Sequence, residues 1–223
     1  MDTQTSVDQL IQKTRRYEFS DGLRDFQLAI LLGFGGVTSW ISFEPFWITF
    51  IGNLSLRYGR WAAWIGMLPM LLLILAVWGM LWLMKKIRQR WLWRNSGMVN
   101  ASKWMVSRRV NILSAVIIIA SISISLFMRS RGWVENSFVL RMIWAATGWG
   151  FGFTLIGVGR EFGLLRYQWL GLVGAGLSTL MLFIPLTFGQ SSLVFGLLWF
   201  VLLMISGWIT LRSAIRTMQT GQV

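Results

Sequence analysis

This chain of 223 residues contains no cysteine and no histidine, and only 8 of its residues are acidic. Without cysteine it has no disulfides, thiolate nucleophiles or thiol metal ligands. Without histidine it has no Ser-His-Asp triad and no imidazole ligand for a metal or haem. Charged residues make up 13% of the chain, against roughly 25% in a soluble domain. These shortages exclude a cytosolic enzyme.

Apolar and basic residues are abundant instead. Hydrophobic residues make up 55% of the chain, which includes 15 Trp and 15 Phe, and the mean hydropathy is +0.60. The formal net charge is +13. This combination is typical of an integral membrane protein whose positive residues lie in loops.

Long uncharged runs locate the membrane spans, because a helix needs about 20 mostly apolar residues to cross ~30 Å of hydrocarbon. They predict an all-α bundle of six transmembrane helices, over residues 25–43, 61–84, 110–128, 140–159, 167–188 and 193–211. The last two spans are divided at a polar turn cluster, Gly189–Ser192. Pro69 and Pro185 are expected to kink the second and fifth spans. Segment 46–56 is too short to cross alone; it is part of span one, a re-entrant segment or an interfacial segment.

The cations predict the orientation, because Lys and Arg accumulate in short cytoplasmic loops. With both termini in the cytoplasm, the outer side receives only Arg57, Arg60, Arg129, Arg131 and Arg141, and the other sixteen of the 21 cations lie inside. The domain plan is then a cytoplasmic segment 1–24, a membrane domain 25–212 with a basic loop 85–109, and a cytoplasmic tail 213–223. We expect a multi-pass protein of the bacterial cytoplasmic (inner) membrane, with no cleavable signal peptide.

The cytoplasmic N-terminal segment predicts a short amphipathic helix. Ser6 and Gln9 form a capping-box pattern, and apolar residues then recur at helical spacing to about Tyr17. Lys13, Arg15 and Arg16 would face anionic headgroups if this helix lies in the membrane interface. Packing against the protein's own cytoplasmic loops is the alternative.

An acidic and aromatic cluster follows at the entrance to the first span. One hypothesis makes it a docking surface for a cytoplasmic protein partner, formed by Tyr17, Glu18, Phe19, Asp21 and Asp25. The other is structural, because acids near a helix N-terminus cap free N–H groups and complement the helix dipole. No metal or cofactor site with a recognised spacing is present in the sequence.

The basic loop predicts contact with anionic membrane lipids. Cations near a cytoplasmic leaflet attract anionic headgroups, and indole rings suit the headgroup level. The candidate residues are Lys85, Lys86, Arg88, Arg90, Trp91 and Trp93. Nucleic acid is rejected as a partner, because no recognition motif accompanies these residues.

Small residues spaced four apart predict close helix contacts, because they let backbones approach where lipid offers no hydrophobic drive. The pairs are Ala29 with Gly33, Ala146 with Gly150, and Gly171 with Ala175. Spans one, four and five are therefore expected to form the packed centre. Such small-residue faces could also join two copies of the chain, so a homo-oligomer is kept as an alternative to a monomer. Glu44 and Arg141 are expected near the outer interface, as separate anchors or as an ion pair.

A short motif occurs twice in the chain. Gly22-Leu23-Arg24-Asp25-Phe26-Gln27 is similar to Gly163-Leu164-Leu165-Arg166-Tyr167-Gln168, with Gly33 and Gly174 in matching register. Each copy stands at the cytoplasmic entrance of a predicted span. The repetition suggests hairpins repeated in parallel orientation, unlike the inverted repeats common in secondary transporters.

The entrance sequence Tyr17-Glu18-Phe19-Ser20-Asp21-Gly22-Leu23 also carries a family resemblance. It resembles the aromatic-acid-aromatic-x-Asp-Gly-Leu motif of small uncharacterised bacterial multi-pass membrane proteins. The loop Arg94–Val99 and the closing pattern from Phe195-Gly196 through Ser206-Gly207 to Leu211-Arg212 are similar too. Those proteins carry Pro and Thr before the Gly of the loop, where this chain has Asn95 and Ser96. The resemblance implies six helices and brings no activity.

Two function classes remain after these steps. The first is a non-enzymatic membrane scaffold or sensor that docks a cytoplasmic partner. The second is a permease-type membrane subunit of a transporter energised by a separate subunit. The absence of nucleotide-binding and hydrolase motifs argues against an enzyme.

Overall fold

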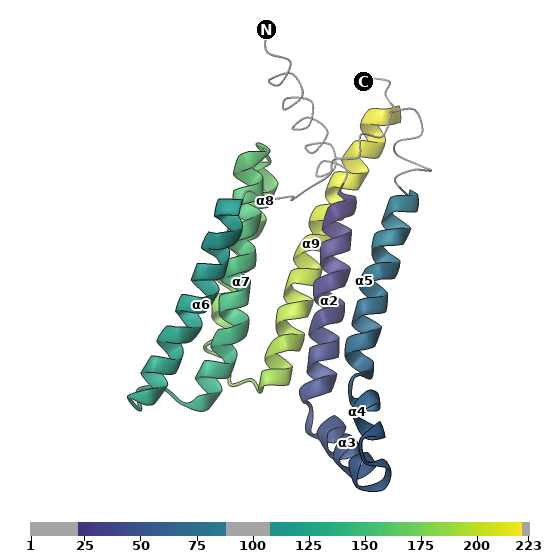
Figure 1. The fold of residues 1–223 in the computed structure, drawn as a ribbon. Coiled ribbons are helices and arrows are strands. Elements are labelled where there is room, and N and C mark those ends of the chain that lie inside the picture. The colour runs from purple at the N-terminus through teal and green to yellow at the C-terminus, as the bar shows by residue number, and fades with distance from the viewer. Residues whose placement is uncertain (1–21, 88–107, 220–223) are drawn as a thin grey trace.

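The computed structural model describes residues 22–87 and 108–219, and these are entirely helices and short turns (Figure 1). The helices are α2 (Leu23–Phe43), α3 (Pro45–Tyr58), α4 (Trp61–Gly66), α5 (Leu68–Ile87), α6 (Arg108–Ser130), α7 (Asn136–Glu161), α8 (Leu165–Leu180) and α9 (Phe188–Gln219). Within the described residues, five helices are long and apolar enough to cross a membrane: α2, α5, α6, α7 and α9. The expectation of an all-α protein is confirmed, and these five helices are suitable in length and composition for a membrane protein. The helix α8, with 16 residues, is shorter than the other five.

The turn between the last two predicted spans was placed too late in the chain. Gly189–Ser192 lies in the first turn of α9, and the actual connection covers residues 181–187, which include Pro185. The reason is a capping box. The Gln190 N–H donates to Thr187 Oγ1, and the Thr187 N–H donates to Gln190 Oε1, both at 3.2 Å. These reciprocal bonds start a helix at the polar cluster that had predicted a turn.

The second predicted span is also divided, because α4 ends at Gly66 and α5 begins at Leu68. The expected interruption at Pro69 is therefore present: the helix breaks at Met67, two residues before this proline, and Pro69 itself lies in the first turn of α5, where it costs no helical hydrogen bond. Segment 46–56 belongs to α3, which is separated from α2 by extended backbone at Glu44 (ψ 141°). It is therefore not a continuation of span one, and none of its side chains is buried.

The long helices form two groups (Figure 1). The helix α2 packs along α9 and against α5, whereas α7 packs along α8 and against α6. Fewer contacts, mostly from α9 to α7 and α8, join the groups. Trp199 of α9 is fully buried at this junction and meets the Phe151 ring of α7 edge-on at 4.7 Å. The expected centre of spans one, four and five was thus wrong in omitting α9, whose Phe195, Trp199 and Leu203 supply much of the core.

By their positions along the helices, the described cations lie toward the two helix ends. The end that carries the start of α2 also carries the ends of α5, α7 and α9 and the starts of α6 and α8. Its cations are Arg24, Lys85, Lys86, Arg108, Arg109, Arg160, Arg166, Arg212 and Arg216. We call this the basic end. Toward the opposite end lie Arg57, Arg60, Arg129, Arg131 and Arg141.

Candidate functional site: a buried carboxylate at the basic end

Asp25 lies in the first turn of α2 and is fully buried. The chain enters this helix through Gly22, whose φ of 74° is in the left-handed region that favours glycine. A Cβ at Gly22 would lie 2.5 Å from the Gly207 carbonyl oxygen of α9. This close approach sets the first turn of α2 directly against α9, and so carries the carboxylate of Asp25 into the interior.

Hydroxyl groups from two other helices bind the Asp25 carboxylate. Ser206 of α9 donates to Oδ2 at 2.7 Å, and the Tyr167 hydroxyl of α8 donates to Oδ1. Tyr167, like Asp25, is fully buried. Both oxygens of the carboxylate are therefore satisfied by side chains from outside its own helix.

Arg166 of α8 supplies the positive charge. Its Nη1 lies 3.6 Å from Asp25 Oδ2, and the Arg166 side chain is 23% exposed. The guanidinium also lies over the Tyr167 ring, 4.7 Å from its centroid, and donates to Thr210 Oγ1 of α9. We call Asp25, Arg166, Tyr167, Ser206 and Thr210 the Asp25 network.

The Asp25 network joins α2, α8 and α9, and so joins the two helix groups at the basic end. A buried ion pair adds little net stability over an apolar pair, but removal of one partner leaves an uncompensated buried charge. Opening this junction would break the Asp25–Arg166 ion pair together with the hydrogen bonds from Tyr167 to Asp25 and from Arg166 to Thr210. Ionisable groups inside membrane domains are the usual markers of functional sites, so the network is the candidate functional site of this chain.

The network uses both copies of the repeated motif. Asp25 and Arg166 occupy equivalent positions in the two copies, as do Phe26 and Tyr167. The matching glycines also have matching roles, because a Cβ at Gly33 would meet Phe200 and a Cβ at Gly174 would meet Trp199. The two copies thus pack against neighbouring aromatic residues of α9.

The predicted docking cluster is only partly described. Tyr17, Glu18, Phe19 and Asp21 lie outside the described residues. Asp25, the fifth residue of that cluster, is fully buried among partners of its own chain, so it does not itself lie on an exposed surface. Sequence reasoning also missed Arg166, Tyr167, Ser206 and Thr210 as a site, although the repeated motif contained two of them.

The predicted lipid-contact residues are described only at the end of α5. Lys85 is exposed, and Lys86 Nζ lies 4.4 Å from the centroid of the Trp82 ring. Arg88, Arg90, Trp91 and Trp93 lie outside the described residues.

The predicted packing residues lie at helix contacts. Ala29 and Ala146 are fully buried. A Cβ at Gly150 would lie 2.6 Å from Ile118 of α6, and one at Gly152 would lie 2.6 Å from the Gly171 carbonyl oxygen. Ala175 is half-buried on the same face of α8, 3.0 Å from that added Cβ.

The suggested ion pair between Glu44 and Arg141 is not formed. Glu44 Oε1 accepts from the Trp40 indole N–H at 2.6 Å. Arg141 Nη1 donates to the carbonyl oxygens of Leu182 and Ile184, at 2.9 and 2.7 Å. Arg141 therefore fastens the turn between α8 and α9, which is a structural role.

Comparison with known proteins returns no match to any family model, curated protein or solved structure.

Proposed function

We propose that this protein crosses a bacterial cytoplasmic membrane six times, with both termini in the cytoplasm. Residues 165–180 of α8 span ~24 Å at about 1.5 Å per residue, and the apolar turn after them extends that reach. Successive long helices run in alternating directions (Figure 1). The excess of cations at the basic end supports a cytoplasmic location for that end.

Within that membrane, the proposed function is a non-enzymatic scaffold or sensor that docks a cytoplasmic partner. The Asp25 network is the observation that carries this proposal. It begins four residues after Asp21, the end of the acidic and aromatic segment 17–21, and it links the two helix groups. A partner that binds Tyr17 and Phe19 would pull on the first turn of α2, and hence on the contacts from Asp25 to α8.

The experiment is affinity purification of the tagged full-length protein in mild detergent, with mass spectrometry of whatever accompanies it. Wild type is expected to retain a stoichiometric cytoplasmic protein. Tyr17→Ala with Phe19→Ala is expected to lose it while the protein still accumulates in the membrane. The matched control is Phe46→Ala with Tyr58→Ala, which removes two exposed aromatics of α3, 59% and 60% exposed, at the opposite end.

Signal transmission has its own readout. Partner binding should change hydrogen exchange in the first turn of α8 in wild type and leave it unchanged in Asp25→Asn. Loss of membrane accumulation in the Tyr17 and Phe19 double variant would instead support a structural role for these aromatics. Recovery of wild type without any partner would overturn docking.

A permease-type transport subunit is the second candidate. The contact of α9 with α7 and α8, which we call the seam between the helix groups, favours it. Three buried polar atoms there have no hydrogen-bond partner among the described residues: Trp144 Nε1 of α7, and Ser191 Oγ and Trp199 Nε1 of α9. Buried polar groups are nearly always paired in a single stable state. A second state that opens the seam would solvate them. A co-purifying ATPase would favour this candidate over a sensor.

A further inference from the structure

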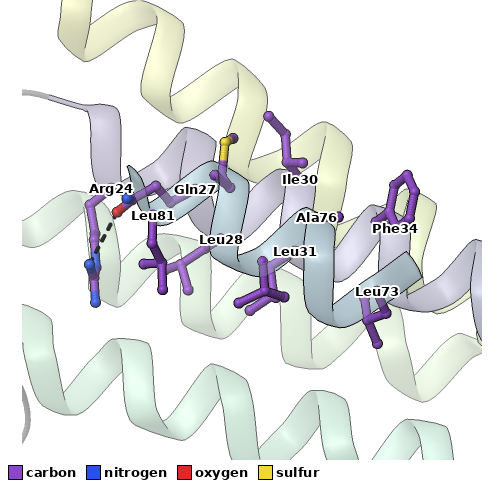
Figure 2. Close-up of a pocket in the computed structure, with 11 residues that line it drawn as sticks. Arg24, Gln27, Leu28, Ile30, Leu31, Phe34, Leu73, Ala76 and Leu81 are labelled. Atoms are coloured by element: carbon purple, nitrogen blue, oxygen red, sulfur yellow. Dashed lines mark hydrogen bonds between the residues drawn. The ribbon is translucent and has the colours of Figure 1, made fainter. Parts of the chain in front are cut away.

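A groove with a cavity volume of about 100 Å³ runs between α2 and α5 (Figure 2). It is lined by Arg24, Gln27, Leu28, Ile30, Leu31, Phe34, Leu73, Ala76, Val77, Met80 and Leu81. The α2 residues from Arg24 to Phe34 recur at helical spacing and extend over ~15 Å of helix axis. Nine of the eleven lining residues are apolar, and both polar ones are at the basic end.

The polar end of the groove is ordered. Arg24 Nη1 donates to Gln27 Oε1 at 3.1 Å, and Figure 2 shows this bond at one end of the row formed by Leu28 and Leu31. Arg24 is half-buried and Gln27 is buried. Lys85 and Lys86 lie in the last turn of α5, at the same end. None of the eleven lining residues is acidic.

We infer that this groove binds one anionic phospholipid of the cytoplasmic leaflet, with an acyl chain between α2 and α5 and its phosphate at Arg24. The groove opens on the outer side of helices that would face lipid, where exposed leucines such as Leu31 and Leu81 line it. Bulk acyl chains compete equally for such apolar walls, because lipid tails are as apolar as leucine. Selectivity therefore comes from Arg24 and the nearby lysines, which favour a negatively charged headgroup.

This inference rests on the proposed membrane placement, and is independent of partner docking. The proposed site for anionic lipid then lies in a groove that ends one residue before Asp25, and not in the basic loop. A lipid held there would contact the helix that carries the Asp25 network, and so would bias the same junction.

The test is native mass spectrometry of the detergent-purified full-length protein, titrated with phosphatidylglycerol or with phosphatidylcholine of the same acyl chains. Wild type is expected to retain one phosphatidylglycerol in preference to phosphatidylcholine. Arg24→Gln should weaken this retention about fivefold, the effect expected for one cation near the headgroup, and Arg24→Lys should restore most of it. Arg160→Gln, which removes an exposed cation at the same end, should have no effect.

A second pair of variants tests the apolar part. Ala76→Trp should fill the groove and lower occupancy by either lipid, whereas Leu75→Trp, at a 61% exposed position of the same helix, should not. Equal lipid retention by wild type and Arg24→Gln, or equal losses in Ala76→Trp and Leu75→Trp, would overturn the inference. Displacement of the lipid by millimolar inorganic phosphate would do so too, since it would indicate a free-anion site.

Carbonate extraction of membranes separates failure of this inference from failure of the proposed function. If the wild-type protein resists extraction but shows no lipid preference, only the proposed lipid site in the groove is overturned. A wild-type protein released by carbonate overturns the membrane placement and the groove together.

Discussion

Asp25 and Arg166 occupy equivalent positions in two copies of one short motif, and the structure pairs them, with 3.6 Å between Arg166 Nη1 and Asp25 Oδ2. The two copies begin alike, since Gly22 and Gly163 both have positive φ, 74° and 66°. They carry opposite charges at the position of Asp25 and Arg166, and Arg24 of the first copy aligns with the uncharged Leu165 of the second. Because Asp25 and Arg166 carry opposite charges, the two helix entrances form an ion pair that joins the two helix groups.

The ion pair predicts unequal effects of its two single substitutions. Arg166→Gln leaves the buried Asp25 carboxylate without its cation, and we expect it to lower the free energy of unfolding by about 3–5 kcal/mol. Asp25→Asn keeps an oxygen acceptor for Tyr167 or Ser206 and leaves Arg166 partly exposed, so about 1–3 kcal/mol is expected.

Thermal and denaturant unfolding in detergent measure both effects. Combining the substitutions should cost less than the sum of the two, because the double variant contains no unpaired charge. Arg160→Gln serves as control, and an exposed cation without these partners should change stability by no more than about 0.5 kcal/mol. Additive effects of Asp25→Asn and Arg166→Gln would contradict a coupled pair.

The all-α class was predictable because long apolar runs depend only on composition along the chain. The division between α8 and α9 was not, since Gly189–Ser192 looks like a turn until Thr187 and Gln190 cap the helix around it. The burial of Asp25 depends on α2 lying against Gly207, far along the sequence. No local pattern in the entrance segment predicts such a long-range approach.

The repeat was the sequence signal closest to the site. It aligned Arg166 and Tyr167 with Asp25 and Phe26, but a similarity between two segments does not predict that the segments are in contact. Ser206 and Thr210, on one face of α9, belong to neither copy; Ser206 occurs in the closing pattern of the family resemblance, but that pattern does not connect it with Asp25.

Glycines of α8 provide a matched stability test. A Cβ at Gly174 would collide with the Trp199 ring, 2.5 Å from Cζ3, whereas a Cβ at Gly176 would have nothing within 4 Å. Gly174→Ala is expected to lower stability by about 1–3 kcal/mol, as overpacking does, and Gly176→Ala by none. The same contrast is expected in α2 between Gly33→Ala, which meets Phe200 at 2.9 Å, and Gly35→Ala, which meets nothing. Thermal unfolding checks it, and equal effects within either pair would contradict the packing at α9.

Gly22 and Gly163 separate backbone strain from close packing. Both have positive φ, so alanine at either position incurs a strain of about 1–2 kcal/mol. Only at Gly22 would the added Cβ also meet a neighbour, the Gly207 carbonyl oxygen at 2.5 Å. Gly22→Ala should therefore destabilise more than Gly163→Ala, and should also weaken the Asp25 network. Equal melting temperatures for the two variants would mean that α2 does not approach α9 this closely.

The proposed topology can be tested cleanly because the chain has no cysteine of its own. A membrane-impermeant maleimide should label Gly132→Cys and Pro185→Cys in intact cells whose outer envelope is permeable to it. It should label Glu161→Cys and Ser213→Cys only after lysis. All four positions are exposed in the structure. The pair Glu161 and Pro185 flanks α8, so opposite labelling shows that this short helix crosses the membrane. Labelling of both from one side would leave five crossings and would place α9 in the reverse orientation.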